Sequence, residues 1–452
     1  MNILICSKLF FPENEIGAIR PTNFAKYLNA MGHSVTVLTG VPKSLFLGSQ
    51  QLNDSIHIER VDHSGFALKL ISGVENRISN RESQLALSRI QSQKKQTIIN
   101  RLYQKFKSFR LEMYNLYLEI DWFLQAKGVI NKKMGDITYD IVLSSFGPLG
   151  SHLIGRFVKK SKRANFWVAD LRDIMHNEEY SKVINLIYLY FEKEMIKKAD
   201  SITVISNGLR EVLERTVGQQ KFRSKNVSVV HNGYENEIET IRAKNNSNIL
   251  KIAYTGSLYS GKRDMSLLFE AIKELVHEKK IERNKVEIHY AGTSSSDLYE
   301  QAYSHGIQDM VHDHGYLLRF QAIELQNSCD FLVVLSWNTR KEQGILSGKF
   351  FEYLQAFKPI IAIINGDLKD SELTKMVKDL NLGIACEYVR KDIDLLLLKG
   401  YLVNQYNNKI LEGNIVFNPN LEQIKEFHYQ KISHKLEKIC QDMTLKSNLL
   451  RG

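Results

Sequence analysis

The residue types best suited to ligand chemistry are concentrated in the stretch GILSGKFFEYLQAFKP, residues 344–359. Its pattern predicts a loop ending at Gly348 and a helix over 349–356, in which Lys349 and Glu352 share one face of the first turn. The lysine, the N–H groups of that turn and the positive end of the helix dipole favour an anion such as phosphate. The carboxylate instead favours hydrogen bonds from sugar hydroxyls. The pair therefore indicates a ligand with phosphate and polyol groups, and a solvated ion pair within the helix is the alternative.

A second stretch, GSLYSGKR (256–263), partly matches a phosphate-binding loop. Gly256, Gly261 and Lys262 have the GxxxxGK spacing, but Arg263 stands where a serine or threonine would hold Mg²⁺. The predicted strands VEIHYAG and DFLVVLS also end without the acidic residue that a P-loop NTPase uses for its metal ion. We therefore expect a metal-independent diphosphate site built from a strand, a glycine turn and two adjacent cations.

Polar residues also follow predicted strands in the first half of the chain. Asp170, Arg172 and Asp173 end the run NFWVADLRD, at the edge where open parallel sheets place ligand-binding groups. A salt bridge between Arg172 and a neighbouring aspartate is the alternative. Gly17 and Arg20 fall in the predicted loop after the first strand, which lacks the GxGxxG fingerprint. Gly17 would let a ligand approach the backbone closely, and a simple turn glycine is the alternative.

Other chemistries are not indicated. His312, Asp313 and His314 alternate along a predicted strand, so they face opposite sides and do not form one metal site. Ser144 and Ser145 lack a GxSxG elbow. The four cysteines have no CxxC spacing, which argues against a zinc site or a disulfide framework and fits a reducing cytoplasm. We therefore expect no metal and no cofactor.

The elements that would position these residues alternate between apolar strands and amphipathic helices. A helix beginning at Pro21-Thr22 connects the first two strands, and such a crossover implies a parallel sheet. The first half predicts a sheet of six or seven strands, namely NILICS, SVTVLT, HIERVDH, IVLSS, NFWVADLRD, SITVIS and VSVVHNG. The second half predicts the strands LKIAYTGS, VEIHYAG, MVHDHGY, DFLVVLS and PIIAII, with helices between them near 265–279, 295–305, 319–328, 349–356 and 370–380.

At 452 residues the chain is too long for one ordinary core, and two domains are expected. The polar stretch 235–249 predicts a linker. The first domain would span residues 1–240, with a basic helical insert at about 65–135, and the second would span 248–415. A C-terminal helix over 416–452 could return to the first domain. Two successive α/β domains leave a cleft between them, which is the expected ligand site.

The net charge of +11 is concentrated in one segment. Between Lys69 and Lys133 the sequence has 13 lysine and arginine residues against 5 acidic residues, a net charge of +8. Its second half repeats apolar residues at helical spacing, at positions 102, 106, 109, 113, 116 and 120. Such a helix could lie on an anionic membrane surface. The alternative is a helix pair packed on its own domain with a solvated basic face.

Composition and the N-terminus restrict the class further. Hydrophobic residues make up 43% and charged residues 25% of the chain, as in soluble globular proteins. The start MNILICSKLF resembles a first strand and not a signal peptide, and no apolar run reaches the length of a membrane span. The basic segment lacks a nucleic-acid recognition motif, so we expect no nucleic-acid partner.

Taken together, these stretches make the chain resemble the retaining glycosyltransferases of family 4 over nearly its full length. In the first half the resemblance is carried by EIGAIRPTNFAKYLNAMGHSVTVLT, DIVLSSFGPLGSHLIG, ADLRD, ADSITVISNGL and VSVVHNG. In the second half it is carried by YTGSLYSGKRDMSLLFEAI, IHYAG, VHDHGYL, SCDFLVVLS and SGKFFEYLQAFKPIIAI. The chain is similar in particular to members that build bacterial capsule or O-antigen repeat units. The resemblance implies an α/β GT-B fold, with two Rossmann-like domains facing across a cleft and a C-terminal helix.

The resemblance also implies roles for the residues that match. Lys262 would neutralise the donor diphosphate, with Arg263 acting in place of the arginine that the family has at the position of Ser257. Glu352 would hold the nucleotide ribose. The family's partner glutamate, eight residues earlier, is replaced here by Gly344. This departure leaves open how the hydroxyls of the donor sugar are held.

The remaining site residues follow from the same resemblance. The family's first-domain histidine is replaced by Ser145, so Asp173 and Arg172 are expected, with Lys262, to be the catalytic residues. The acceptor side would comprise Arg20, Ser145 and His152. The donor side would comprise Gly17, Gly256, Ser257, Lys262, Arg263, Gly292, Tyr316, Lys349 and Glu352.

The implied reaction moves a sugar from a nucleotide diphosphate, UDP or GDP with UDP favoured, to an acceptor hydroxyl with retention of configuration. Lys262, Lys349 and helix N-termini, and not a metal ion, would stabilise the leaving diphosphate. The acceptor would be a glycan or a polyprenyl-diphosphate-linked sugar. The protein would be cytoplasmic, or peripheral on the inner face of the cell membrane, where the basic segment would dock. A UDP-sugar epimerase of similar fold and a non-catalytic sugar-nucleotide-binding protein, the latter suggested by Gly344, are the alternatives.

Overall fold

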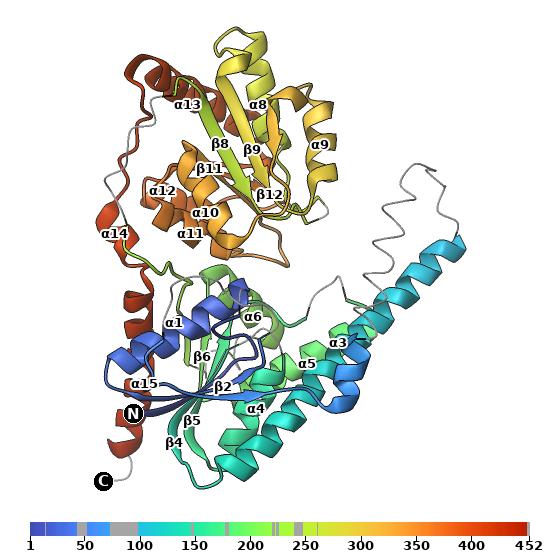
Figure 1. Ribbon diagram of the computed structural model, residues 1–452, viewed down its shortest axis with the longest axis vertical. Helices are drawn as coiled ribbons and strands as arrows, with labels where there is room; N and C mark the ends of the chain where they lie inside the picture. The colour runs from blue at the N-terminus through green and yellow to red at the C-terminus, as the bar shows by residue number, and fades with distance from the viewer. Residues whose placement is uncertain are drawn as a thin grey trace. The chain divides into compact units, whose positions relative to one another are not determined.

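The computed structural model describes residues 1–13, 15–42, 52–72, 98–145, 149–176, 180–218, 222, 226–238, 247–259 and 261–449, with the backbone alone for 98–104 and 446–449. Much of the predicted basic segment (73–97) and of the predicted linker (239–246) therefore lies outside the described residues. The chain forms two compact units, coloured in chain order in Figure 1. The first comprises Met1–Val204, Thr216–Ser228 and Leu436–Gly452, and the second comprises Ile205–Arg215 and Val229–Lys435.

The sheet of the first unit has seven strands in the order β3-β2-β1-β4-β5-β6-β7, and the pairs from β3 to β6 are parallel. The strands are β1 (Asn2–Cys6), β2 (Ser34–Gly40), β3 (His57–Val61), β4 (Tyr139–Ser145), β5 (Ala164–Leu171), β6 (Ser201–Val204) and β7 (Asn226–Val229). The four residues Ile3 to Cys6 are fully buried. A strand buried on both faces reads as a continuous apolar run, which is why the sequence predicted this sheet correctly.

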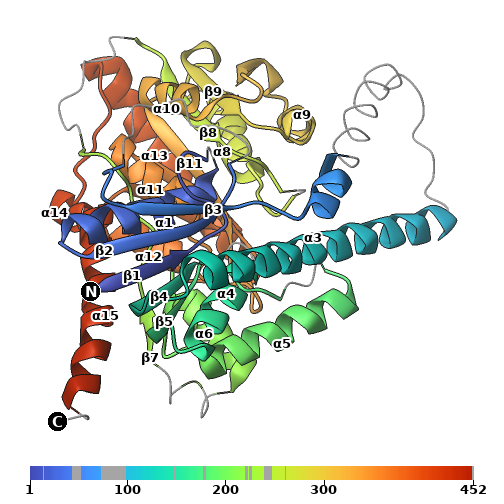
Figure 2. The same cartoon turned by 60° about the horizontal axis from the view of Figure 1, so that its bottom comes forward.

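Helices cover this sheet on its two faces. They are α1 (Ile16–Ala30), α3 (Ile98–Lys133), α4 (Leu149–Lys160) and α5 (Lys182–Lys198). Helix α4 packs on β4 and β5, and α3 packs on α4, as Figure 2 shows. The indole of Trp122 on α3 is fully buried and donates to the carbonyl of Val61 at the end of β3, 3.1 Å away. The long helix is therefore anchored to its own domain through its C-terminal half.

The start of α1 corrects the sequence prediction. The helix begins at Ile16 and not at Pro21, so Gly17 and Arg20 are helical and not loop residues. A proline inside a helix lacks the N–H that would bond the carbonyl four residues earlier, here that of Gly17. The Nη1 atom of Arg172 donates to this carbonyl at 2.5 Å instead. A side chain from the end of β5 thus replaces the missing helix hydrogen bond and lets the helix continue through the proline.

The second unit contains a six-stranded parallel sheet in the order β10-β9-β8-β11-β12-β13. Its strands are β8 (Leu250–Thr255), β9 (Val286–Ala291), β10 (Val311–Asp313), β11 (Phe331–Trp337), β12 (Ile360–Asn365) and β13 (Gly383–Glu387). Its helices are α6 (Asn207–Val217, most of which belongs to this unit), α8 (Ser266–His277), α9 (Ser295–Ser304), α10 (Arg319–Ser328), α11 (Gly348–Ala356), α12 (Glu372–Asp379), α13 (Lys391–Glu412) and α14 (Leu421–Lys425). The sequence prediction omitted β13 and α13.

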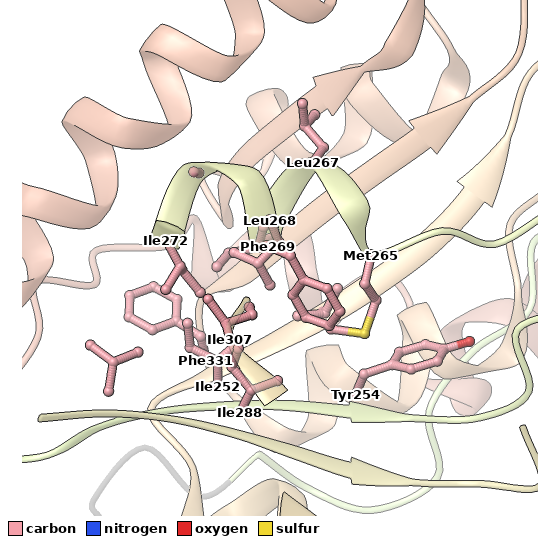
Figure 3. Close-up of a cluster of buried hydrophobic side chains, with 14 of the residues drawn as sticks. Ile252, Tyr254, Met265, Leu267, Leu268, Phe269, Ile272, Ile288, Ile307 and Phe331 are labelled. Carbon is pink, nitrogen blue, oxygen red and sulfur yellow. The ribbon is translucent and has the colours of Figure 1, made fainter. Parts of the chain in front are cut away.

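Successive residues of the central strands enter opposite hydrophobic cores. Ile252 and Phe331 face the core that includes Leu268 of α8, and Figure 3 shows this cluster. Their neighbours Ala253 and Leu332 face the second core, which α11 and α12 complete. This alternation is the two-residue period of a strand, and both faces are apolar because helices cover both. The buried sheet thus provides a rigid base for the loops that leave its edge.

The last helix is α15 (Tyr429–Leu449). Its residues from Leu436 onward belong to the first unit, where Glu437 Oε1 lies 2.8 Å from His33 Nε2. Among the helices in the described part of the chain, none combines the length and the apolar character that crossing a membrane would require.

Candidate active site

Both sheets have the strand order of a doubly wound fold, which reverses between β1 and β4 in the first unit and between β8 and β11 in the second. In such sheets ligands bind beyond the carboxyl ends of the strands at the reversal. In the second unit the loops that leave this edge include 256–265, 292–294, 314–318 and 338–347. The expected donor residues from Gly256 to Tyr316 all lie on these loops, and Lys349 and Glu352 lie on α11, directly after the last loop.

The loop after β8 is closed by its own backbone. Gly256 and Gly261 have φ angles of +150° and +90°, which glycine adopts most readily. The N–H groups of Lys262 and Arg263 donate to carbonyls earlier in the loop, at 3.1 and 3.0 Å. Since these two N–H groups are engaged, the loop would meet a phosphate chiefly through the two cationic side chains. A P-loop instead cradles phosphate in backbone amides.

The ammonium group of Lys262 is paired with a glutamate from the loop after β11. Its Nζ lies 3.1 Å from Oε2 and 3.4 Å from Oε1 of Glu342. The indole Nε1 of Trp337 donates to the same Oε2 at 2.6 Å, and Lys262 Nζ lies 5.1 Å from the centroid of that ring. The side chains of Lys262 and Glu342 are 34% and 18% exposed, so the pair remains accessible from solvent.

Arg263 lies beside Lys262 on the same aromatic surface. Its guanidinium carbon is 4.5 Å from the centroid of the Tyr259 ring and 5.7 Å from that of Trp337. Such cation–π contacts hold a guanidinium in place without neutralising its charge. The neighbouring Ser257 hydroxyl lies 3.1 Å from the hydroxyl of Thr293, in the loop after β9. The structure therefore brings both predicted cations to one part of the sheet edge.

Close contacts between glycines join the loops after β8, β9 and β10. A Cβ atom on Gly292 would lie 2.2 Å from the carbonyl oxygen of Gly256, so only glycine fits there. The N–H of Gly292 donates to the carbonyl of Gly315 at 2.9 Å. The next residue is Tyr316, whose side chain is 72% exposed at this edge. The expected donor residues of three loops thus lie close together.

Glu352 on α11 is nearly buried and held from two sides. Its Oε1 accepts hydrogen bonds from Gln326 Nε2 at 2.7 Å and from Lys349 Nζ at 3.1 Å. The same amide of Gln326 also donates to Thr255 Oγ1 at the end of β8, at 3.0 Å. The Lys349–Glu352 pair within the helix therefore forms, but the carboxylate is 10% exposed and not solvated as in the alternative reading. Gln326 connects it to the strand that precedes the Lys262 loop.

The structure explains why position 344 is a glycine and not the glutamate that the resemblance implied. Its φ of +66° lies in the left-handed region. A Cβ atom there would lie 2.4 Å from Ser206 Oγ and 2.7 Å from the Cα of Gly208, both at the start of α6 in the same unit. The approach is so close that a glutamate at this position would have to displace backbone. The acidic residue of this loop that pairs with Lys262 is Glu342, two residues earlier.

At the carboxyl edge of the first sheet, Asp170 is the centre of a buried network. Arg20 donates to both of its oxygens, at 2.7 and 3.0 Å, and the hydroxyls of Ser145 and Thr203 donate at 2.9 and 2.7 Å. Burial by itself raises the pKa of Asp170, but the charge of Arg20 and the hydrogen bonds outweigh it and lower the pKa below its usual value. Two expected acceptor-side residues, Arg20 and Ser145, thus belong to one rigid ion-pair network.

His152 lies in a second buried group. Its Nδ1 is 2.7 Å from the hydroxyl of Ser144, which also accepts a hydrogen bond of 2.7 Å from the indole of Trp167. Burial lowers the pKa of His152 to about 3, so the imidazole is neutral.

The expected catalytic residues Arg172 and Asp173 follow β5. One N–H of Arg172 is committed to the carbonyl of Gly17, as described above. Asp173 is exposed, and its Oδ1 accepts the N–H of Ile174 at 2.9 Å. Of the two, the aspartate is the one that faces solvent.

Sequence reasoning did not single out Glu342, Trp337 and Gln326. Trp337 ends β11 and Glu342 lies five residues beyond it, so attention to the residues after each strand would have included both. Gln326 lies within α10, and its sequence context carries no comparable signal.

The two histidines of the HDH stretch face the same side of β10, and both rings stack on His289 of β9, at centroid distances of 5.0 and 5.3 Å. In the described residues, no group of three or more histidine, cysteine or acidic side chains is arranged to hold a metal ion.

No protein-family model and no curated protein matches the sequence. Solved structures do match it. Sucrose-phosphate synthase from Thermosynechococcus elongatus has a TM-score of 0.62 at 11% identity, covering 99% of this chain and 100% of that chain. The apo structure of OtsA has a TM-score of 0.56 at 11% identity, covering 97% and 99%. A variant of TarM from S. aureus, in complex with Fondaparinux, alpha-GlcNAc-glycerol and UDP, has a TM-score of 0.54 at 11% identity, covering 97% and 99%.

At this level of identity the likeness establishes the fold. The two α/β units with parallel sheets of seven and six strands are those of the GT-B fold, as the resemblance implied.

Proposed function

We propose that this protein is a retaining glycosyltransferase of the family 4 type. It would transfer a sugar from a nucleotide-diphosphate donor, with UDP as the favoured nucleotide, to a glycan or a polyprenyl-diphosphate-linked acceptor. The role would be in the synthesis of a bacterial surface polysaccharide, and the protein would act from the cytoplasm. The second unit would bind the donor and the first the acceptor.

One observation carries this proposal. Four loops and α11 meet at the carboxyl edge of the second sheet, at its topological reversal, and present two adjacent cations together with a nearly buried carboxylate. Cations suit a diphosphate, and the carboxylate suits the hydroxyls of a ribose. The proteins of similar fold also support it, since one of them is described in complex with UDP and with a glycosylated glycerol.

The geometry suggests how these groups would act. Lys262 and Arg263 would stabilise the negative charge that develops on the departing diphosphate, without a metal ion. Gln326 and Lys349 orient Glu352 through its Oε1 atom. Its Oε2, which lies 3.8 Å from Arg319 Nε, would accept the ribose hydroxyls.

The first test measures donor binding. Nucleotide sugars that differ in base and sugar are screened by thermal shift, because a ligand that binds only the folded state raises the melting temperature. Incubation of the best donor, labelled in the sugar, with and without acceptor extracts then separates transfer from isomerisation. A stabilising UDP-sugar whose label passes to an acceptor supports the proposal. Isomerisation of the donor alone would instead indicate an epimerase.

The second test uses variants. Lys262→Ala and Glu352→Ala should each lower turnover at least tenfold, about 1.4 kcal/mol of transition-state stabilisation, while circular dichroism shows a retained fold. Glu274→Ala is a matched control, since this glutamate of α8 pairs with Lys399 of α13. Near-normal turnover in either site variant would remove that residue from the mechanism.

We also propose that the first unit contacts an anionic membrane through α3. Phe106, Met113, Ile120 and Leu124 recur along this helix at intervals of seven, seven and four, and all are exposed. A stripe at this spacing lies on one face. The side chains of Lys105, Lys107, Arg110, Lys127 and Lys132 are also exposed on this helix.

The acidic residues of α3 are engaged on its inner side. Glu112 Oε2 accepts a hydrogen bond of 2.9 Å from the backbone N–H of Ser181. Glu119 Oε1 accepts one of 2.9 Å from the ammonium group of Lys8. Asp121 lies 3.0 Å from His63 Nδ1. The outward face therefore combines apolar side chains with cations, which is the surface that anionic lipids attract.

Co-sedimentation with vesicles of phosphatidylglycerol and phosphatidylethanolamine tests this contact. Lys105→Glu/Lys107→Glu should lower the partition constant at least about thirtyfold, since each of the two basic residues near the surface contributes about 1 kcal/mol. Lys431→Glu/Lys438→Glu on α15 changes the net charge equally and serves as the control. Equal sedimentation of both variants, or preferential binding of duplex DNA, would contradict the proposal.

A further inference from the structure

The carboxylate that holds Lys262 occupies the place that a diphosphate would need. Both oxygens of Glu342 lie within 3.4 Å of Lys262 Nζ, so the cation expected to bind the ligand is already neutralised. A phosphate bound to the same ammonium group would lie close to this carboxylate, and the two anions would repel each other. The Glu342 carboxylate therefore opposes anion binding at Lys262 until its side chain moves away.

The surroundings of Glu342 hold it in this position while leaving a route out. Its backbone is fixed by a reciprocal pair of hydrogen bonds with Thr339, in which the N–H of Glu342 donates to Oγ1 at 3.2 Å and its carbonyl accepts at 3.0 Å. Two residues later, Gly344 is packed tightly against the start of α6. The loop backbone is thus pinned on both sides, and the side chain, 18% exposed, is the part that can rotate away.

The indole of Trp337 gives the carboxylate a second anchor. Its Nε1 donates to Glu342 Oε2 at 2.6 Å, and the face of the same ring lies against Lys262. The tryptophan therefore contacts both members of the ion pair. Any exchange of Glu342 for another anion changes the environment of this ring.

We propose that Glu342 is a built-in competitor for the diphosphate site. It holds Lys262 in the empty protein, yields to the donor, and returns to Lys262 to expel the nucleoside diphosphate product. The inference rests on the proposed function and adds a residue that sets ligand affinity and product release. A diphosphate carries more negative charge after the sugar has left, so without a competitor the product would be held more tightly than the donor. Release of product often limits turnover in transferases that close around their substrates.

The test measures the dissociation constants of UDP and of inorganic pyrophosphate by calorimetry. Glu342→Gln removes the charge but keeps an oxygen for the indole of Trp337 to bond. We expect it to tighten the binding of both probes about two- to fivefold, the effect of removing a partly exposed ion pair. Glu274→Gln changes the net charge equally, away from the sheet edge, and should leave both constants unchanged.

A double-mutant cycle shows whether the effect passes through Lys262. In a Lys262→Ala background the substitution Glu342→Gln should have little effect, because no ammonium group is left to release. Tightening of the same size in that background would overturn the proposal, since it would indicate general repulsion. Weaker binding in Glu342→Gln alone would also overturn the proposal, because Glu342 would then be a group that contacts the ligand. Unchanged binding would overturn it as well, because Glu342 would then have no effect on ligand affinity.

The fluorescence of Trp337 gives an independent readout. Pyrophosphate should change the emission of the wild-type protein, and the change should be absent in Trp337→Phe.

The proposed function and the proposed role of Glu342 as a competitor would fail with different results. If UDP does not bind but pyrophosphate binds more tightly to Glu342→Gln, the proposed function falls and the competitor stands. If UDP binds the wild type and Glu342→Gln binds no tighter, the competitor falls and the proposed function stands. If neither probe binds any variant, both fall.

Discussion

Replacing Gly344 by alanine should destabilise the second unit far more than an ordinary glycine substitution. Two costs add at this position. A residue with a Cβ atom at a φ of +66° loses about 1 kcal/mol relative to glycine. The added atom would also lie 2.7 Å from Cα and 2.8 Å from N of Gly208, which are backbone atoms that cannot rotate away. Overpacking of this kind costs about 1–3 kcal/mol.

Gly315 offers a matched control for the first cost. Its φ is +65°, but a Cβ atom there would have no neighbour within 4 Å. Gly315→Ala should therefore lose about 1 kcal/mol and Gly344→Ala about 3 kcal/mol. For a unit of about 200 residues this difference of about 2 kcal/mol corresponds to a fall in melting temperature of about 4–8 °C, which scanning calorimetry resolves.

Gly344→Glu, which would restore the residue expected from the resemblance, should be at least as destabilising as the alanine variant. If Gly344→Ala were no less stable than Gly315→Ala, the crowding against Gly208 would not constrain the loop. The physical explanation for the missing glutamate would then be wrong.

Three further predictions concern the first unit. Asp170→Asn should lower the free energy of unfolding by about 3–5 kcal/mol, because it leaves a buried arginine without its anion. As a control, Asp173→Asn at an exposed position should change it by less than about 0.5 kcal/mol. Equal losses for the two variants in urea unfolding would contradict this prediction. His152 is neutral when folded but titrates near 6.5 when unfolded, so stability should fall as the pH drops from 6.5 towards 3, by about 2 kcal/mol at pH 5. His152→Asn cannot take up this proton and should show a shallower pH dependence, and an identical slope would disprove the assignment. Arg172→Met should lower the free energy of unfolding by about 1–2 kcal/mol, because it removes the donor to the carbonyl of Gly17 in the first turn of α1. Adding Pro21→Ala should recover part of that loss by restoring a helix N–H. If the double variant were no more stable than Arg172→Met, the Arg172 side chain would not replace the N–H that Pro21 lacks.

Much of the fold could be predicted from the sequence because its signals are local. Strands such as NILIC and DFLVVLS are buried on both faces, so they are continuous apolar runs that need no tertiary information to recognise. The positions of Lys262 and Glu352 near strand ends and helix starts follow from the same local patterns. The start of α1 could not be predicted in this way, since Pro21 is a signal for a helix start and its tolerance inside the helix depends on Arg172, which is 151 residues away.

The sequence by itself determined that two α/β units exist, which residues are cations or carboxylates at the ends of their strands, and which fold results. Only the tertiary structure decided how those groups are paired. The contacts of Lys262 with Glu342, of Glu352 with Gln326 and of Gly344 with Gly208 join segments that are 80, 26 and 136 residues apart. Pairing of this kind depends on the path of each loop and on the direction of each side chain, and neither is encoded in local periodicity.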